Sequence, residues 1–226
     1  MISRAILFDL DGTLLDSAPD MVNALQRLLA EQGRTRCDYD FARAHVSRGA
    51  GGLITAGFPD LDGDEARGEL RQRFLDLYAQ RICEGSALFP GCEALLERIE
   101  AHPTLTWGIV TNKPTWLTTP LLEQLNLLER APCVVCGDTL AQRKPDPAPL
   151  RHAAELLGVA ARECIYSGDD QRDIQAAKGA EMPVVAAAWG YIAPGEIIEQ
   201  WGADAICATP AHFTTWLDEH GWFDAG

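Results

Sequence analysis

The sequence predicts an α/β protein in which a Rossmann-like core with a parallel sheet carries an inserted all-helical cap domain. Two observations predict this class. From residue 86 onward, short apolar runs typical of strands alternate with runs of helical spacing. Between Leu15 and Cys83 the spacing of apolar residues is helical, and no strand is expected. We therefore predict a core of residues 1–14 and 86–226 and a helical cap of residues 15–85.

The first part of the chain is expected to contain one strand followed by helices. Ala5–Phe8 is a short apolar run that leads into a turn, as a buried strand would. Residues 19–32 and 41–78 are expected to be mainly helical. In the second of these segments, glycine-rich turns are expected at residues 49–52 and 57–59.

The remainder of the chain is expected to alternate between strands and helices. The predicted strands span residues 107–110, 132–135, 164–166, 183–187 and 203–206. The predicted helices span residues 92–100, 116–125, 147–157 and 171–180. Strands that alternate with helices of this length form a parallel sheet with helices on both faces.

The composition argues against several classes of protein. The formal net charge is −14, whereas nucleic-acid binding depends on Lys and Arg that neutralise phosphates. No stretch approaches the roughly 18 apolar residues of a membrane span, and residues 1–6 contain no signal-peptide cleavage site. We expect a cytoplasmic protein, a monomer or a homodimer, that binds neither nucleic acid nor a membrane.

The cysteines indicate a reducing compartment. There are seven, an odd number, and their spacing does not resemble a disulfide framework. Cys133 and Cys136 form a C-x-x-C pair, but it lies in an apolar strand-like run and no second pair completes a zinc site. A structural role is expected for this pair.

Four polar motifs lie where predicted strands end and turns begin. They are Asp9-Leu10-Asp11-Gly12-Thr13, Thr111-Asn112-Lys113, Lys144-Pro145 and Gly168-Asp169-Asp170-Gln171-Arg172-Asp173. Each motif alone is compatible with an ordinary turn, helix cap or loop. In a parallel sheet, however, ligands bind outside the carboxyl ends of the strands. The four motifs together therefore predict one site at this edge of the sheet.

The charges of these motifs indicate a divalent cation and an anionic substrate. The motifs would place four carboxylates in one crevice: Asp9, Asp11, Asp169 and Asp173. Crowded carboxylates either take up protons or hold a cation, and oxygen ligands favour Mg²⁺. The ion would also reconcile an acidic protein with an anionic substrate. Only three of the 19 basic residues are lysines, and two of these, Lys113 and Lys144, lie in the motifs.

At these residues the chain resembles the haloacid dehalogenase-like superfamily of phosphatases, over its whole length and including the position of the helical cap. Within it, the chain is similar to the phosphoglycolate phosphatase group in DLDGTLLDS at 9–17, VTNKP at 110–114 and RKPDPAPL at 143–150. It also resembles a subgroup acting on N-acetylmuramic acid 6-phosphate, in residues 107–114, 168–174, 189–192 and 201–204. The resemblance implies a magnesium-dependent phosphomonoesterase with 2-phosphoglycolate or N-acetylmuramic acid 6-phosphate as its substrate.

The resemblance also implies roles for individual residues. Asp9 would be the nucleophile and form an aspartyl-phosphate, while Asp11 would act as general acid and base. The phosphoryl group would be held by three residues: Thr111, Asn112 and Lys144. Mg²⁺ would bind Asp9, Asp169 and the backbone carbonyl of Asp11, supported by Asp173. Asp170 departs from the family pattern, in which a small hydroxyl residue is usual, and could contact a metal-bound water or cap a helix.

Two further residues are candidates for substrate binding: Lys113 and Arg48. Arg48 lies in the cap loop Ser47–Gly52 and could clamp a substrate carboxylate; the alternative is a solvated arginine beside a turn. Two rival functions remain open, a sugar phosphomutase that uses the same aspartyl-phosphate and a non-catalytic binding protein on this fold.

Overall fold

The computed structural model describes residues 2–224 and contains a six-stranded sheet in which every strand pair is parallel. The order across the sheet is β5-β4-β1-β6-β7-β8. These strands are β1 (Arg4–Phe8), β4 (Leu105–Val110), β5 (Val134–Val135), β6 (Cys164–Gly168), β7 (Val184–Ala187) and β8 (Ala205–Cys207). The predicted parallel α/β core is confirmed.

Nine α-helices are found among the described residues. They are α1 (Ala18–Glu31), α2 (Tyr39–Arg43), α3 (Gly49–Gly57), α4 (Asp64–Ala79), α5 (Cys92–Glu100), α6 (Thr115–Gln124), α7 (Ala148–Leu157), α8 (Gln171–Gly179) and α9 (Pro210–Glu219). Short 3₁₀ helices are η1 (Val46–Arg48), η2 (Ala161–Glu163) and η3 (Ile198–Gln200). The last α-helix was not expected from the sequence.

Two hydrophobic cores lie on opposite faces of the sheet, because successive side chains of a strand point to opposite sides. On β1, Ile6 and Phe8 belong to the core that contains the buried residues of α5 and α9. Ala5 and Leu7 belong to the other core, under α7 and α8. Both faces of the sheet are therefore covered.

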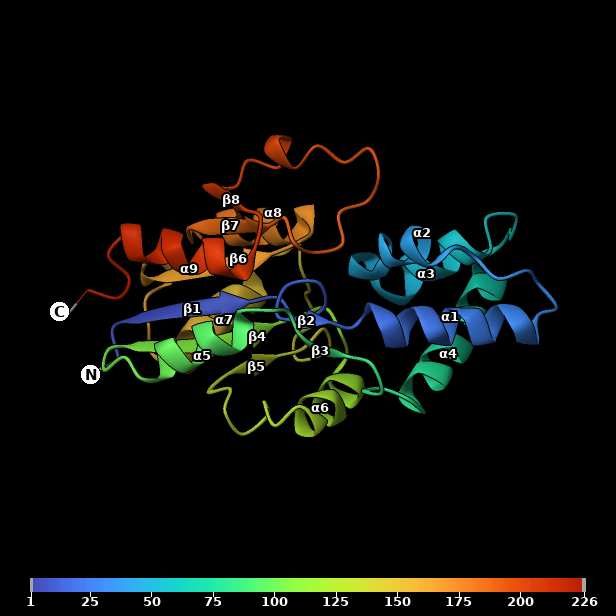
Figure 1. The fold of residues 1–226 in the computed structure, drawn as a ribbon, viewed down its shortest axis with the longest axis horizontal. Coiled ribbons are helices and arrows are strands. Elements are labelled where there is room, and N and C mark those ends of the chain that lie inside the picture. The colour runs from blue at the N-terminus through green and yellow to red at the C-terminus, as the bar shows by residue number, and fades with distance from the viewer. Residues whose placement is uncertain (1, 225–226) are drawn as a thin grey trace.

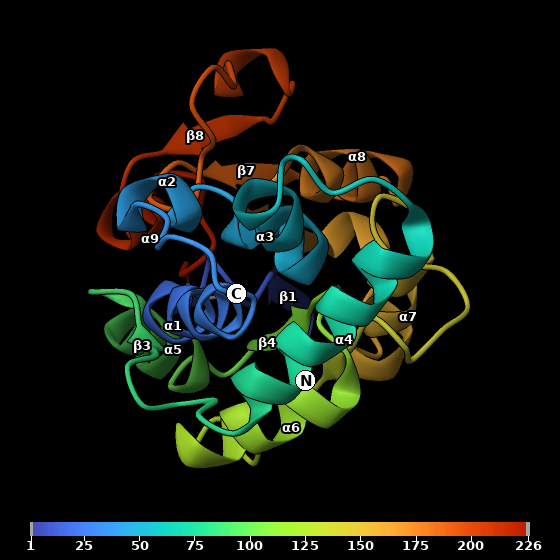
Figure 2. The same cartoon turned by 90° about the vertical axis from the view of Figure 1, so that its right-hand side faces the viewer.

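The helices α1 to α4 form a group beside the sheet (Figure 1). Seen from that side, α1, α3 and α4 lie in front of β1 and β4 (Figure 2). The chain enters and leaves this group through β2 (Leu15–Asp16) and β3 (Ala87–Leu88), which pair in antiparallel fashion. The expectation that no strand begins between Leu15 and Cys83 is therefore wrong. A two-residue strand is too short for a periodic signal, and its partner lies far away in sequence.

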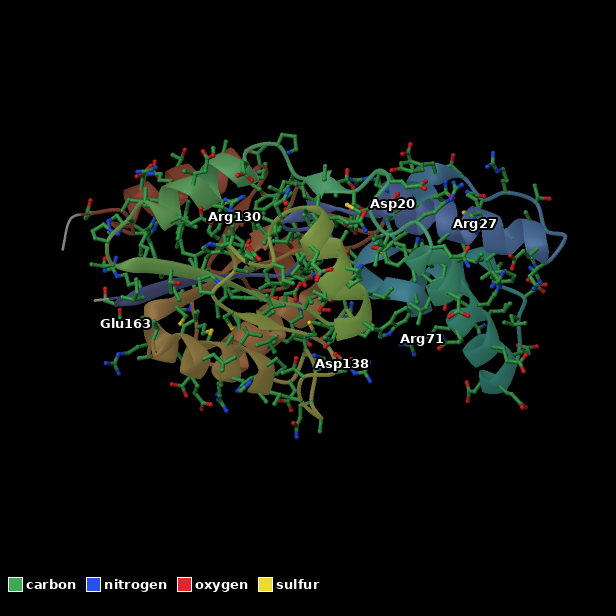
Figure 3. The ribbon with its side chains drawn as sticks, turned by 90° about the horizontal axis from the view of Figure 1, so that it is seen from below. Asp20, Arg27, Arg71, Arg130, Asp138 and Glu163 are labelled. Carbon is green, nitrogen blue, oxygen red and sulfur yellow. The ribbon has the colours of Figure 1, made fainter. Side chains whose placement is uncertain are left out.

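The buried Asp20 ties the two chain crossings together. Its carboxylate accepts hydrogen bonds from the backbone N–H of Gly85 at 2.9 Å and from the N–H and hydroxyl of Ser86 at 2.8 and 2.6 Å. Asp20 lies near the start of α1, where the helical group meets the rest of the chain (Figure 3). These bonds help to fix the position of the helical group over the strand ends. The predicted domain bounds themselves stay a prediction.

The expected turn at residues 49–52 is wrong, because α3 begins there. A Cβ atom on Gly52 would lie 2.7 Å from the carbonyl oxygen of His45 and 2.5 Å from the Cβ of Arg48. This glycine therefore permits close packing of the helix against the preceding segment, and the usual turn interpretation of clustered glycines fails here.

All seven cysteines are free, and both members of the C-x-x-C pair, Cys133 and Cys136, are buried. Burial raises the pKa of Cys133 to about 11, which suits an inert core thiol. Across residues 2–224, no helix has the length and apolar character needed to cross a membrane.

Candidate active site

The strand order reverses at β1, and the predicted motifs meet at this point. Asp9 follows β1, Thr111 follows the neighbouring β4, and Asp169 follows β6 on the other side. Backbone hydrogen bonds fix the first two: Asp9 N–H donates to the carbonyl of Ser167 and Thr111 N–H to that of Val135, both at 2.9 Å. The crevice at a reversal of strand order is the usual ligand site of such sheets.

Lys144 is the central cation of the site and is 3% exposed. Its Nζ lies 2.8 Å from Asp9 Oδ1, 2.7 Å from Asp173 Oδ1 and 2.8 Å from the hydroxyl of Tyr166. Burial alone would lower the pKa of Lys144, but Asp173 and Asp9 outweigh it and raise the pKa. The ammonium is therefore charged and holds two carboxylates.

Asn112 acts on the backbone of Lys144. Its Nδ2 donates to the Lys144 carbonyl at 2.9 Å, and its Oδ1 accepts the Lys144 N–H at 3.0 Å. Asn112 was predicted to bind substrate, which stays a prediction; its amide joins the second motif to the third with one of its two N–H groups and its oxygen. Asn112 also lines the cavity described below.

Three carboxylates form a cluster suited to a metal ion: Asp9, Asp169 and Asp173. Each offers one oxygen, and these oxygens lie within 4.8 Å of one another. Burial raises the pKa of Asp169 well above its usual range, and Asp9 and Asp173 raise it further. Burial and Asp9 likewise raise the pKa of Asp173, against the opposing effect of Lys144. Burial makes the ionised form of these carboxylates unfavourable. A hard divalent cation bound to their oxygens would stabilise that form.

Two glycines let the backbone close around Asp169. A Cβ on Gly12, which has φ 89°, would lie 2.0 Å from Asp169 Oδ2. A Cβ on Gly190 would lie 2.3 Å from the Asp169 Cβ. Any side chain at either position would displace Asp169, so both loops are shaped around this carboxylate.

The Asp11 side chain is directed away from the cluster. Its carboxylate accepts from Ser17 Oγ at 2.5 Å and from Lys113 Nζ at 3.0 and 3.1 Å. Lys113 Nζ also lies 3.0 Å from the hydroxyl of Tyr78. Burial would lower the pKa of Lys113, but Asp11 and Tyr78 outweigh it and raise the pKa. Lys113 was predicted to bind substrate, and the structure instead gives its ammonium to Asp11.

Asp170 caps α8, which is one of the two roles left open for it. It accepts from the N–H and the Nε of Arg172, both at 2.8 Å. Burial opposes ionisation, but Arg172 outweighs it and lowers the pKa of Asp170. Arg172 Nη2 also donates to the carbonyl of Ser47 at 2.9 Å, and the Ser47 hydroxyl lies 2.5 Å from Asp169 Oδ2. The helical group thus reaches the carboxylate cluster.

A cavity of about 300 Å³ joins the strand ends to the helical group. Its lining includes all the predicted site residues except Asp169 and Asp173. Arg48 lies in it but pairs with Glu196, and its side chain is 50% exposed. Arg71 and Arg143 also line it, and neither side chain makes a hydrogen bond or ion pair with any residue from 2 to 224. Arg71 extends from α4 toward the sheet-bearing part of the molecule (Figure 3).

Five contributors to the site were missed from the sequence: Ser17, Ser47, Tyr78, Tyr166 and Arg172. Ser17 and Arg172 lie inside the quoted motifs DLDGTLLDS and GDDQRD, so a signal was available. Ser47 opens the cap loop that was singled out for Arg48. The sequence around Tyr78 does not indicate a role in the site, because an aromatic residue at helical spacing is typical of the hydrophobic core.

Known proteins resemble this chain closely in sequence. A family model described as haloacid dehalogenase-like hydrolase matches residues 6–187. A phosphoglycolate phosphatase of Xanthomonas campestris pv. campestris is 45% identical over 207 residues, 92% of this chain and 93% of that protein. An N-acetylmuramic acid 6-phosphate phosphatase of Pseudomonas putida is 39% identical over 218 residues, 95% of this chain and 96% of that protein.

Solved structures share the fold over almost the full length. The crystal structure of a predicted phosphoglycolate phosphatase from Haemophilus somnus 129PT superimposes with a TM-score of 0.83 at 26% identity, covering 95% of this chain and 97% of that one. The crystal structure of a hydrolase from Pseudomonas syringae gives a TM-score of 0.73 at 27% identity, covering 96% and 99%.

Proposed function

Because this chain belongs to the haloacid dehalogenase-like hydrolase family, we propose that it is a magnesium-dependent phosphomonoesterase acting on a small phosphorylated organic acid or sugar acid. One observation carries the proposal. Lys144 holds Asp9 and Asp173 beside the buried Asp169, at the edge of a cavity that has cationic side chains around it. An anionic phosphate can approach the nucleophilic carboxylate there only if positive charge offsets the repulsion from the other carboxylates.

In the proposed reaction an Asp9 oxygen attacks phosphorus, and the bond between phosphorus and the ester oxygen breaks. The departing oxygen takes a proton from Asp11. Water then attacks the phosphorus of the aspartyl-phosphate and gives its proton back to Asp11, which releases phosphate and restores Asp9. Lys144 orients Asp9 throughout and neutralises charge that develops on the transferring group.

Thr111 supplies a hydrogen-bond donor for a phosphoryl oxygen. Its Oγ accepts the Lys113 N–H at 3.1 Å, so the hydrogen of its hydroxyl is free to point into the cavity. A magnesium ion held by Asp9, Asp169 and the Asp11 carbonyl, with Asp173 in support, would offset the negative charge of substrate and carboxylates.

Removal and return of the metal test this proposal. A chelator should stop phosphate release, and Mg²⁺ should restore it. Mg²⁺ at 100 times its Kd should also stabilise the fold by about 2.7 kcal/mol, or about 5–10 °C in Tm for a chain of this size. Asp169→Asn should lose this shift while its metal-free Tm stays at or above that of the parent protein, because a buried carboxylate is gone.

Asp62→Asn is the matched control, since Asp62 is exposed on the loop between α3 and α4. It should keep both the activity and the metal-dependent Tm. Phosphate release that resists chelation would contradict the role of the metal. Exchange between sugar phosphate isomers without phosphate release would identify a mutase instead.

The substrate is proposed to carry a carboxylate that the helical group binds. The two relatives are named for 2-phosphoglycolate and N-acetylmuramic acid 6-phosphate, and both molecules carry one. In the first the carboxylate is adjacent to the phosphate ester, whereas in the second it lies across the sugar. Arg71 and Arg143 are exposed at the cavity and lack partners among the described side chains, which favours the longer molecule. Arg48 would have to exchange Glu196 for the substrate.

A pair of variants distinguishes these arginines. For N-acetylmuramic acid 6-phosphate, Arg71→Ala should raise KM about 10- to 100-fold, the effect of one lost charge-assisted hydrogen bond. Arg48→Ala should raise KM less, because Glu196 already competes for its guanidinium. Steady-state kinetics on both substrates and on p-nitrophenyl phosphate, which has no carboxylate, provide the measurement. Equal KM increases on all three compounds would rule out a carboxylate clamp.

A further inference from the structure

The carboxylate of Asp11 is held by a buried chain of contacts that begins in the helical group. Tyr78 lies in the last turn of α4, and its hydroxyl is 3.0 Å from Lys113 Nζ. The same ammonium reaches both oxygens of Asp11 at 3.0 and 3.1 Å. Ser17 completes the set with a hydroxyl 2.5 Å from Asp11 Oδ1.

Each N–H group of the Lys113 ammonium has a hydrogen-bond partner. An ammonium has three N–H groups, and its three neighbours are the two Asp11 oxygens and the Tyr78 hydroxyl. Binding a phosphoryl oxygen would require Lys113 to give up one of these bonds inside a buried site, which is costly. Lys113 is therefore better suited to orient Asp11 than to hold the substrate.

Tyr78 is rigid enough to serve as the anchor of this chain. It is 1% exposed, and its ring stacks on Phe74 with centroids 6.4 Å apart and planes 15° from parallel. Lys113 Nζ lies 4.5 Å from the centroid of the Tyr78 ring, so the aromatic face adds a second attraction for the ammonium. The position of Lys113 thus depends on where α4 lies over the strand ends.

We propose that Tyr78 is a positioning residue: through Lys113 it orients Asp11 for proton transfer with the leaving group, and it makes that step depend on the docking of α4. The inference rests on the role proposed above for Asp11. It adds that the helical group contributes to the chemical step as well as to substrate binding.

The leaving group provides the test of the first step, because protonation of the departing oxygen matters only when that oxygen is a poor leaving group. Tyr78→Phe keeps the ring and deletes the hydroxyl, which frees one N–H of Lys113 to turn away from Asp11. We expect kcat to fall about 10- to 100-fold on an alkyl phosphate such as 2-phosphoglycolate, part of the 10²–10⁴-fold effect of a positioned general acid. On p-nitrophenyl phosphate, whose leaving group needs no proton, the release of p-nitrophenol in a single turnover should slow less than about threefold, whereas hydrolysis of the aspartyl-phosphate still needs Asp11 as the base.

Lys113→Gln provides a second variant and should show the same dependence on the leaving group. If Lys113 bound the phosphoryl group instead, KM would rise on both substrates alike, and the proposal would be overturned. Tyr39→Phe, on the exposed helix α2, is the matched control and should leave all constants unchanged. Equal slowing of aspartyl-phosphate formation on both substrates, or no slowing, with Tyr78→Phe would also overturn it.

Asp11→Asn separates this inference from the proposed function. If Asp11→Asn loses the alkyl phosphate activity and Tyr78→Phe does not, only the positioning role fails. If Asp11→Asn keeps full activity on the alkyl phosphate, the acid–base role itself fails. Thermal unfolding of each variant shows whether the kinetic change comes from a folded protein.

Discussion

Asp9→Asn is expected to lower kcat by about 10⁴-fold or more while the protein remains folded. The substitution keeps the shape of the side chain and removes the nucleophilic oxygen, so no aspartyl-phosphate can form. The fold should persist because Lys144 retains Asp173 and Tyr166 as partners. Phosphate release measures the first effect, and circular dichroism with thermal unfolding measures the second.

The covalent intermediate can be intercepted to strengthen this test. Hydroxylamine converts an acyl phosphate into a hydroxamate, so peptide mass spectrometry during turnover should find this adduct on Asp9. Asp11→Asn is a useful control, because with p-nitrophenyl phosphate it should still form the intermediate and should hydrolyse it slowly. An Asp9→Asn protein with near-normal activity, or turnover that never yields the adduct, would contradict the covalent mechanism.

Lys144→Met is expected to damage both catalysis and stability. Methionine has a similar length but no charge, so Asp9 and Asp173 would face each other beside Asp169 without a counter-ion. Loss of one partner of a buried ion pair costs about 3–5 kcal/mol in the free energy of unfolding. Loss of a charge aimed at the transition state should lower kcat by about 10²–10³-fold or more.

Urea unfolding of the metal-free proteins and phosphate release provide the two readouts. Lys178→Met is the matched control: Lys178 is exposed on α8, so the change should stay within about 0.5 kcal/mol. Adding Asp173→Asn to Lys144→Met should recover part of the stability and none of the activity, because it removes the uncompensated charge. Unchanged urea unfolding of Lys144→Met would contradict the electrostatic role of Lys144.

The convergence of the motifs could be predicted because it depends on short-range features. Asp9, Thr111 and Asp169 each follow an apolar run, and in a parallel sheet such positions lie at one edge whatever the intervening segments do. Their side-chain partners could not be predicted in the same way. Nothing near Asn112 in the sequence indicated that its amide bonds the Lys144 backbone, 32 residues along the chain.

By itself, the sequence determined the parallel α/β core, the edge at which the motifs meet and the set of carboxylates and lysines that assemble there. Only the tertiary structure decided how those charges are paired: Lys113 with Asp11 and Tyr78, Lys144 with Asp9 and Asp173, and Arg48 with Glu196. The physical reason is range. Strand and helix patterns arise from neighbouring residues, whereas the partner of a buried charge is set by packing between segments far apart in sequence.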